Sequence, residues 1–467
     1  MALIKSISGI RGTIGGNSGD NLTPLDVVKF ASAFGTWLKL RSKSTKVVIG
    51  RDARPSGEMV STLITSTLQG LGIHVVDLGL STTPTVEIAV PLEKASGGII
   101  VTASHNPVQW NALKLLNEKG EFISAKDGEE VLKLAEEENF DFVPVGKLGK
   151  YEKNNTYLQK HIEMILALPL VNVEAIRSKS FKVVVDAVNS TGGIAVPMLL
   201  HELGVSVKEM YCEPTGQFPH NPEPLPEHLG DICREIEKGK YDLGIVVDPD
   251  VDRLVLISED GTPFGEEYTL VAVADYILGA RKKKGGNTVS NLSSTRALRD
   301  ITEKAGGKYV AAAVGEVNVV QAMKEHKAVI GGEGNGGVIY PDLHYGRDAL
   351  VGIALFLSHL VTMGLTASRL RSTYPRYHIS KNKIELTRGM DVDAVLEAVR
   401  EKYKKQPTNT IDGVKIEFER EWVHLRKSNT EPIIRIYAES DLEAKANHLA
   451  RKIMTDIKEI VSAKSQA

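Results

Sequence analysis

Lys46-Val47-Val48-Ile49-Gly50 has the pattern of a short buried strand, and the same pattern returns twice further along the chain. All three copies share one order of elements: a strand, an amphipathic helix and a second strand. Their predicted residues are 46–50, 58–70 and 71–76; 182–186, 194–202 and 203–207; and 287–291, 294–304 and 306–310. Strands that alternate with amphipathic helices indicate α/β units. The repeat predicts three similar α/β domains rather than one continuous sheet.

The pattern changes after residue 372. A predicted helix over 391–404 is followed by short alternating strands and by a final helix from Asp441. The expected fold class is therefore α/β with four domains, three similar mixed α/β domains and a smaller C-terminal α+β domain. The predicted domain ranges are 1–150, 151–258, 259–372 and 373–467.

Composition and charge limit the classes of protein to which this chain can belong. The 467 residues carry 57 basic and 59 acidic side chains, a net charge of -2, which argues against nucleic acid as a partner. Two cysteines cannot make a disulfide framework, and this fits a reducing compartment. The longest apolar stretch, 349–357, is too short to cross a membrane, and the N-terminus lacks the apolar core of a signal peptide. We expect a soluble, cytoplasmic protein.

A possible nucleophile lies in Thr102-Ala103-Ser104-His105-Asn106-Pro107, directly after the apolar run 98–101. Catalytic residues collect where a buried strand ends, because the scaffold is rigid there and the loop is open to ligands. The Ser104 hydroxyl beside the His105 imidazole suggests covalent phosphoryl or acyl chemistry. Serine before Asn-Pro is also common in plain turns and helix caps, so that alternative stays open.

Asp248-Pro249-Asp250-Val251-Asp252-Arg253 follows a second buried strand, 243–247, and precedes a third, 254–257. Carboxylates at alternate positions of a tight turn repel one another unless a cation lies between them. Asp248, Asp250 and Asp252 therefore form a candidate Mg²⁺ site. An EF-hand calcium loop is rejected because Arg253 stands where glycine is required and the flanking segments are predicted strands. The remaining alternative is a solvated acidic turn.

The run Gly332-Glu333-Gly334-Asn335-Gly336-Gly337 matches the dinucleotide fingerprint G-x-G-x-x-G, but a strand follows it where that fingerprint requires a helix. We interpret it as a turn between strands. Its glycines allow a ligand to approach closely, and Glu333 and Asn335 offer hydrogen bonds to sugar hydroxyls. A plain glycine hairpin is the open alternative.

A polar loop between two predicted strands begins at Arg426. Its short side chains and two arginines are the groups that bind a phosphate dianion, and a solvated polar turn is the alternative. The candidate phosphate ligands are Arg426, Ser428, Asn429, Thr430 and Arg435. Weaker candidates elsewhere, each equally explained as an exposed polar or charged residue, are Arg11, Arg51, Arg54, Asn111 and Lys114.

Taken in order, the serine loop, the Asp-x-Asp-x-Asp-Arg loop, the Gly-Glu loop and the terminal Arg-x-Ser-x-Thr-Glu-Pro loop resemble the α-D-phosphohexomutase family. The match covers essentially the whole chain, with one motif in each predicted domain. The resemblance implies four domains around a central cleft. It also implies that Ser104 is carried as phosphoserine and that Asp248, Asp250 and Asp252 hold one Mg²⁺ per chain, with a phosphoryl oxygen on Ser104 as a further ligand.

The same resemblance implies roles for the remaining motif residues. Arg253 lies beside the phosphoryl group, whereas Arg11, His105 and Lys114 surround the reacting oxygens. Glu333 and Asn335 bind sugar hydroxyls, and the terminal loop grips the phosphate that does not react. Two departures from the family stand out: Gly337 replaces a common histidine, for which His344 is the candidate substitute, and 312–315 is apolar where many relatives are polar.

The implied activity is a phosphosugar mutase that interconverts hexose 6-phosphate and hexose 1-phosphate through phosphoserine and a hexose 1,6-bisphosphate, which also serves as activator. Lys114 also serves as general acid or base. The form of the glycine loop favours phosphoglucosamine mutase, with phosphomannomutase or phosphoglucomutase as the alternative. A serine phosphatase and a non-catalytic sugar-phosphate binding module are the other hypotheses. The sequence gives no indication of the oligomeric state.

Overall fold

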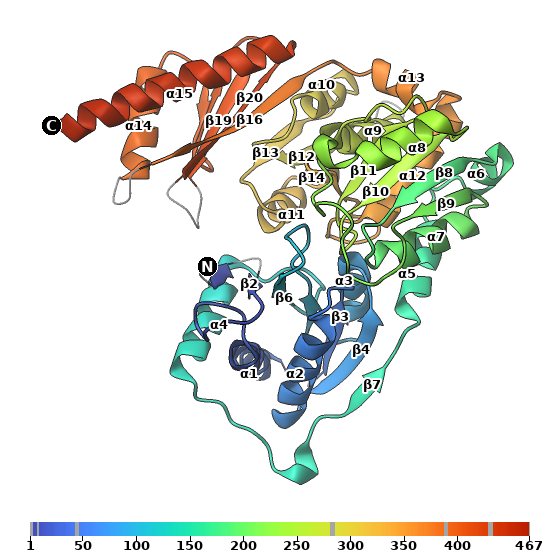
Figure 1. The fold of residues 1–467 in the computed structure, drawn as a ribbon, viewed down its shortest axis with the longest axis vertical. Coiled ribbons are helices and arrows are strands. Elements are labelled where there is room, and N and C mark those ends of the chain that lie inside the picture. Colours follow the sequence, from blue (N-terminus) through green and yellow to red (C-terminus); the bar gives the residue numbers. More distant parts are fainter. Residues whose placement is uncertain are drawn as a thin grey trace. The chain divides into compact units, whose positions relative to one another are not determined.

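The computed structural model describes residues 3–6, 9–42, 46–280, 285–386, 391–427 and 433–466, with side chains as far as residue 462. The chain divides into two compact units. Figure 1 labels their helices and strands. The first unit comprises Met1–Ala280 and Asn335–Arg371, and the second comprises Arg281–Gly334 and Ser372–Ala467.

The first unit begins with a seven-stranded mixed sheet of order β1-β2-β6-β5-β3-β4-β7. Its strands are β1 (Ile4–Ser6), β2 (Gly9–Thr13), β3 (Lys46–Arg51), β4 (His74–Leu80), β5 (Gly97–Val101), β6 (Trp110–Leu116) and β7 (Tyr151–Lys153). One apolar core contains residues of α1 (Pro24–Arg41), α2 (Gly57–Gly70) and α4 (Ala125–Glu137), and a separate core contains those of α3 (Thr83–Leu92). The buried centre of the sheet, β5, therefore lies between two packed layers and leads directly into the Ser104 loop.

A four-stranded sheet of order β11-β10-β8-β9 follows in the same unit. Its strands are β8 (Lys182–Asp186), β9 (Ser206–Met210), β10 (Leu243–Val247) and β11 (Leu254–Ser258). The helices of this region are α5 (Tyr157–Leu166), α6 (Val173–Lys179), α7 (Gly192–Glu202) and α8 (Gly230–Lys238). Strands β10 and β11 are antiparallel neighbours, so the loop Asp248–Arg253 turns between them as the sequence predicts.

The first unit is completed by α9 (Glu266–Ala280) and by the returning segment with β15 (Gly337–Ile339), α12 (Ala349–Met363) and α13 (Ala367–Ser372). Helix α12 contacts α5, α6 and α9, so its N-terminus is fixed among elements that are distant in the sequence. Arg347 and Asp348 directly precede that N-terminus, and Asp348 caps it.

The second unit holds two sheets. Strands β12 (Asn287–Asn291), β13 (Tyr309–Ala312) and β14 (Ala328–Glu333) run parallel, with α10 (Ala297–Lys304) and α11 (Glu316–Glu325) between them in the chain. The C-terminal sheet is antiparallel, in the order β16-β20-β19-β18-β17. Its elements are β16 (His378–Glu385), α14 (Val392–Lys402), β17 (Thr408–Asn409), β18 (Val414–Glu417), β19 (Trp422–Lys427), β20 (Ile433–Ser440) and α15 (Glu443–Gln466).

All three predicted strand–helix–strand repeats are present, but the second strand of each copy starts about three residues later than predicted. The reason is the same in each copy. Gly72, Gly204 and Gly306 have φ angles of +80°, +67° and +77°, the left-handed conformation that ends a helix. The sequence pattern assigned these turn residues to the strand because apolar or small residues flank the glycine. Strand β7 also pairs with β4, beyond the predicted domain limit at residue 150.

Within the part of the chain that the structure describes, no helix is long and apolar enough to cross a membrane.

Helix α1 packs over the first sheet and starts with a polar cap centred on Asp26. The backbone N–H of Thr23 donates to one carboxylate oxygen of Asp26 at 3.0 Å, and the N–H of Gly19 donates to the other at 2.9 Å. Partial burial opposes ionisation of Asp26, but these hydrogen bonds and those from the Thr23 and Ser18 hydroxyls lower its pKa. The ionised cap therefore stabilises the fold above the unfolded-state pKa, and this stabilisation is lost as the pH falls through the lower folded-state pKa.

Asp26→Asn should lower the free energy of unfolding by about 1 kcal/mol at pH 7. The difference from the wild type should begin to shrink at pH 4, near the ordinary aspartate pKa of about 3.9, because the unfolded wild-type chain then binds a proton at Asp26 while the folded cap is still ionised. Urea unfolding at both pH values measures it. The exposed Asp141→Asn serves as the control, and a penalty for Asp26→Asn that stays constant with pH would contradict the prediction.

Candidate active site

Ser104 lies in a tight turn at the carboxyl end of β5. Its φ angle is +49°, a conformation that non-glycine residues rarely adopt and that concentrates at functional sites. The Ser104 backbone N–H donates to the Thr102 hydroxyl at 2.9 Å, and that hydroxyl donates to Asp52 at 2.6 Å. These hydrogen bonds stabilise the strained turn. Ser104 itself is only 4% exposed.

The side chain of Arg54 binds the main chain of the same loop. Its guanidinium donates four hydrogen bonds to main-chain carbonyls of the loop, and its Nε donates to Asp52 at 3.0 Å. The four acceptors are the carbonyls of Ser104, Asn106 and Pro107, each at 2.6 Å, and of Trp110 at 3.0 Å. The sequence presented Arg54 as an ordinary charged residue, whereas the structure buries it at 1% exposure.

The aspartate loop lies beside this serine. Asp248, Asp250 and Asp252 are all fully buried, and one oxygen from each lies within 4.8 Å of the others. The Ser104 hydroxyl donates to Asp248 at 2.8 Å, so the first two predicted motifs meet. Val251, at the centre of the loop, has φ +65°, which is strained for a β-branched residue. The backbone conformation of this loop directs the three aspartate carboxylates toward one another.

These carboxylates fit a divalent cation. Among the described residues, Asp250 Oδ1 and Asp252 Oδ1 are buried without a hydrogen-bond partner. Burial and the neighbouring Asp252 and Asp250 carboxylates raise the pKa of Asp248 well above its usual value. An all-oxygen, acidic donor set of this kind is the one that Mg²⁺ prefers. The solvated acidic turn is therefore excluded, because none of the three side chains reaches solvent.

Two buried cations partly balance the three negative charges. Lys114 comes from β6, opposite Ile100 of β5, and its ammonium lies 2.7 Å from Asp250 and 3.7 Å from Asp252. Burial lowers the pKa of Lys114, but the two carboxylates outweigh it and raise the pKa, so the ammonium stays charged. Arg347 donates to Asp252 at 2.6 Å. No motif pointed to Arg347, since it lies far along the chain just before α12.

Arg11, His105 and Arg253 lie at the same site. Burial, and then the nearby Arg253 and Arg11, lower the pKa of His105 well below its usual value, so its imidazole is neutral at pH 7. His105 Nδ1 lies 3.3 Å from the Ser104 hydroxyl, and Arg11 donates to Asn106 at 2.8 Å. Glu223 was not predicted. Its carboxylate lies 3.4 Å from Arg253 and 4.0 Å from His105 Nε2.

Thr83 is another residue that the sequence did not indicate. Its hydroxyl donates to Asp250 at 2.6 Å and its backbone N–H donates to the Asp250 carbonyl at 2.9 Å. The start of α3 therefore supports the aspartate loop. Only long-range contacts reveal Thr83, Arg347 and Glu223, and a single sequence carries no signal for them.

The glycine loop is a turn between β14 and β15, as predicted, and it crosses from the second unit to the first. Within the second unit, Glu333 accepts hydrogen bonds from Asn291 at 2.8 Å and from the Gly315 N–H at 3.1 Å. Within the first unit, Asn335 accepts from the Gly337 N–H at 3.2 Å.

Gly337 has no room for a side chain. A Cβ atom there would lie 2.4 Å from Cδ of Arg347, whose side chain passes over this glycine toward Asp252. His344 does not fill that space. Its imidazole lies between Glu87, at 3.4 Å, and Asp348, at 3.3 Å.

The predicted phosphate loop of the C-terminal domain is described only at its edges. Arg426 on β19 and Arg435 on β20 are direct cross-strand partners, so two like charges lie side by side. Asp412 pairs with Arg426 at 2.9 Å. Ser428, Asn429 and Thr430 lie outside the described residues.

The Arg54 contacts lead to a structural prediction. A lysine cannot serve four carbonyls and a carboxylate at once, so Arg54→Lys leaves buried acceptors unpaired, at a cost of at least ~2 kcal/mol to the loop. The loop amides of residues 104–110 should then exchange hydrogen about 30-fold faster, measured by hydrogen-exchange mass spectrometry. Arg51→Lys is the matched control, because the Arg51 guanidinium donates to the carbonyl of the adjacent Asp52, at 3.3 Å, rather than to the Ser104 loop. Equal protection in the two variants would contradict the prediction.

The four domain models of phosphoglucomutase/phosphomannomutase match the chain in order. Alpha/beta/alpha domains I, II and III match residues 3–142, 159–261 and 265–377, and the C-terminal domain matches residues 383–455. The fold is thus mixed α/β with four domains, as the sequence predicts.

Individual relatives agree with the domain matches. A phosphoglucomutase/phosphomannomutase of Thermococcus kodakarensis is 37% identical over 93% of this chain and 95% of its own. A phosphoglucosamine/phosphogalactosamine mutase of Sulfurisphaera tokodaii is 29% identical over 99% and 100%. The crystal structure of a phosphoglucomutase/phosphomannomutase family protein from Burkholderia thailandensis superposes with a TM-score of 0.84 at 25% identity, covering 98% of both chains. The chain therefore belongs to the phosphoglucomutase/phosphomannomutase family, the α-D-phosphohexomutases that the sequence motifs resemble.

Proposed function

We propose that this enzyme is a phosphosugar mutase in which Ser104 carries the phosphate that is exchanged. The observation that carries the proposal is the hydrogen bond from the Ser104 hydroxyl to Asp248, within a buried group of three carboxylates and the cations Lys114 and Arg253. Phosphoryl transfer depends on positioning and charge neutralisation, and this site supplies both. An acyl-transfer serine would have no use for three adjacent carboxylates.

Asp248, Asp250 and Asp252 would hold one Mg²⁺, with an oxygen of the Ser104 phosphate as a further ligand. A bound Mg²⁺ supplies positive charge to the transferring phosphoryl oxygens. The two orphaned carboxylate oxygens of Asp250 and Asp252 support this assignment. Lys114 and Arg347 hold the carboxylates in place from the protein side.

In the first transfer, the bond between phosphorus and Ser104 Oγ breaks and a bond to a free hydroxyl oxygen of the hexose phosphate forms. The sugar hydroxyl gives up its proton to a base of the site, and Ser104 regains one. The charged Lys114 is placed to act as acid, and the neutral His105, 3.3 Å from Ser104 Oγ, is placed to accept the Ser104 proton when the phosphate returns to the serine. Arg11 and Arg253 supply further positive charge.

The product of this step is a hexose 1,6-bisphosphate. When it turns around, its other phosphate returns to Ser104, and the exchanged hexose monophosphate leaves. A fixed binding site for the phosphate that does not react allows one serine to exchange phosphate with either end of the sugar. The adjacent Arg426 and Arg435 support such a site, because a phosphate dianion relieves the repulsion between them. We include Ser428, Asn429 and Thr430 in it. Free hexose 1,6-bisphosphate would act as activator by loading Ser104.

For the sugar we propose glucosamine phosphate, with mannose or glucose phosphate as the alternative. The support is the Gly-Glu-Gly-Asn-Gly-Gly form of the loop and the phosphoglucosamine mutase named among the relatives. Glu333 and Asn335 are the proposed ligands of the sugar hydroxyls. We also retain the four-domain division near residues 150, 258 and 372, which the positions of the family matches support, with β7 counted in the first domain because it pairs with β4.

The central experiment is phosphopeptide mapping after incubation with glucose 1,6-bisphosphate and Mg²⁺. We expect one phosphoryl group per chain, on Ser104, and chase of that group into product on addition of a hexose phosphate. Ser104→Ala should lack the label and lose at least about 10³-fold in turnover. Ser66→Ala, an exposed serine on α2, is the control and should behave as the wild type.

Other outcomes would redirect the proposal. Release of the Ser104 phosphate to water at the rate of its formation would make the protein a serine phosphatase. A chain that binds hexose phosphates but never acquires a phosphoserine would be a sugar-phosphate binding module.

Parallel assays on the 6-phosphates of glucosamine, mannose and glucose test the proposed sugar. We expect the highest kcat/KM with glucosamine 6-phosphate. A value at least tenfold higher for mannose or glucose 6-phosphate would overturn the choice of sugar while leaving the mutase mechanism intact.

A further inference from the structure

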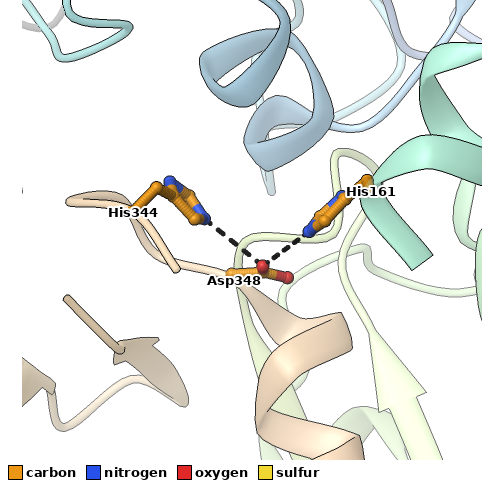
Figure 2. A group of neighbouring side chains, drawn as sticks. All are labelled: His161, His344 and Asp348. Carbon is orange, nitrogen blue, oxygen red and sulfur yellow. Dashed lines mark hydrogen bonds and ion pairs between the residues drawn. The ribbon is translucent and has the colours of Figure 1, made fainter. Parts of the chain in front are cut away.

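A second group of possible metal ligands lies outside the proposed phosphoryl-transfer machinery, among His161, His344 and Asp348. His161 comes from α5, and His344 and Asp348 come from the segment before α12. Figure 2 shows both imidazoles pointing at one carboxylate oxygen of Asp348. His161 Nε2 lies 2.9 Å from Asp348 Oδ2, and His344 Nε2 lies 3.3 Å from the same atom.

These separations suit ligands of a single ion. Ligand atoms around one transition-metal ion lie about 2.9–3.4 Å apart when the bonds are about 2.0–2.1 Å long. All three candidate atoms lie within 4.8 Å of one another, so a small side-chain rotation closes them around an ion. Two imidazoles and one carboxylate are a donor set for Zn²⁺ and similar divalent transition metals, unlike the all-oxygen set of the aspartate loop.

Each candidate ligand is also oriented through its far atom. His161 Nδ1 lies 2.9 Å from the Thr85 hydroxyl, which is itself 2.7 Å from the Thr82 hydroxyl. Asp348 Oδ1 accepts from the N–H groups of Leu350 and Val351 at the start of α12. Outer contacts of this kind fix the tautomer and direction of metal ligands.

His344 is oriented by a second carboxylate. Its Nδ1 lies 3.4 Å from Glu87, which is 2% exposed. Without an ion, both nitrogens of His344 face buried carboxylates, although a neutral imidazole has only one N–H to donate. With an ion on Nε2, a neutral imidazole donates Nδ1–H to Glu87, an arrangement common at metal sites.

We propose that His161 Nε2, His344 Nε2 and Asp348 Oδ2 bind one divalent transition-metal ion of the Zn²⁺ class. His161 and Asp348 are fully buried and the His344 side chain is 12% exposed, so the remaining coordination position lies on the His344 side. This site is separate from the proposed Mg²⁺ site, although Arg347, the residue before Asp348, contacts Asp252. The proposal does not depend on the proposed mutase activity.

The test uses the full chain, stripped with a chelator and then held in excess Mg²⁺ to saturate the aspartate loop. Calorimetric titration with Zn²⁺, and metal analysis after gel filtration, should give one Zn²⁺ per chain, with release of protons. His344→Gln should weaken Zn²⁺ binding at least 100-fold, and Glu87→Gln should weaken it about 10- to 100-fold. Co²⁺ bound in place of Zn²⁺ should give visible absorption bands that His344→Gln lacks.

Two controls separate this site from others. His220→Gln removes a histidine of similar exposure, 14%, which lies 2.9 Å from the single carboxylate of Asp186 and should leave Zn²⁺ binding unchanged. Asp248→Asn alters only the aspartate loop and should also leave it unchanged. Thermal unfolding without Zn²⁺ verifies that each variant is folded.

The proposal is overturned if the wild type binds no Zn²⁺ in excess Mg²⁺, or if His344→Gln binds it as the wild type does. It is also overturned if Asp248→Asn abolishes the binding. In these cases His161, Asp348 and His344 form a hydrogen-bonded network held by protons.

Discussion

Three buried carboxylates lie on the loop between β10 and β11. The packing of the first unit depends on placing cations beside them that offset their negative charge. Carboxylates that lie this close together in a low-dielectric interior repel one another by several kcal/mol unless cations compensate. The fold supplies Lys114 from β6 and Arg347 from the segment before α12, and it anchors the loop through Thr83. Elements from three parts of the chain thus converge on one short, buried loop.

The same balance explains how the site suits phosphoryl transfer. Two of the carboxylates are neutralised from the protein side, yet each keeps one oxygen free of hydrogen bonds among the described residues, so affinity for a cation remains. The serine is fixed independently, by the Arg54 contacts to its loop carbonyls. The proposed phosphate carrier and the proposed cation site are therefore positioned largely by different residues and meet in the hydrogen bond from Ser104 to Asp248.

The sequence predicted those parts of the site whose residues are adjacent in the chain. Ser104 and the three aspartates stand in short motifs at strand ends, and both motifs occupy one site. Arg54, Thr83, Glu223 and Arg347 were missed or undervalued because their roles come from contacts across many residues. The strand–helix–strand repeats were predicted correctly, and the starts of their second strands were wrong where a left-handed glycine ends the helix. The phosphate loop of the C-terminal domain stays a prediction.

The contact between Gly337 and Arg347 has a consequence for how this family diverges. A side chain at position 337 and an arginine at position 347 compete for one volume, because a Cβ on Gly337 would lie 2.4 Å from Cδ of Arg347. A side chain at position 337 alone would force the Arg347 side chain to move, and loss of Arg347 alone would leave Asp252 with the more distant Lys114, at 3.7 Å. Across related sequences the two positions should therefore change together, which would make the pair a marker of lineage within the family.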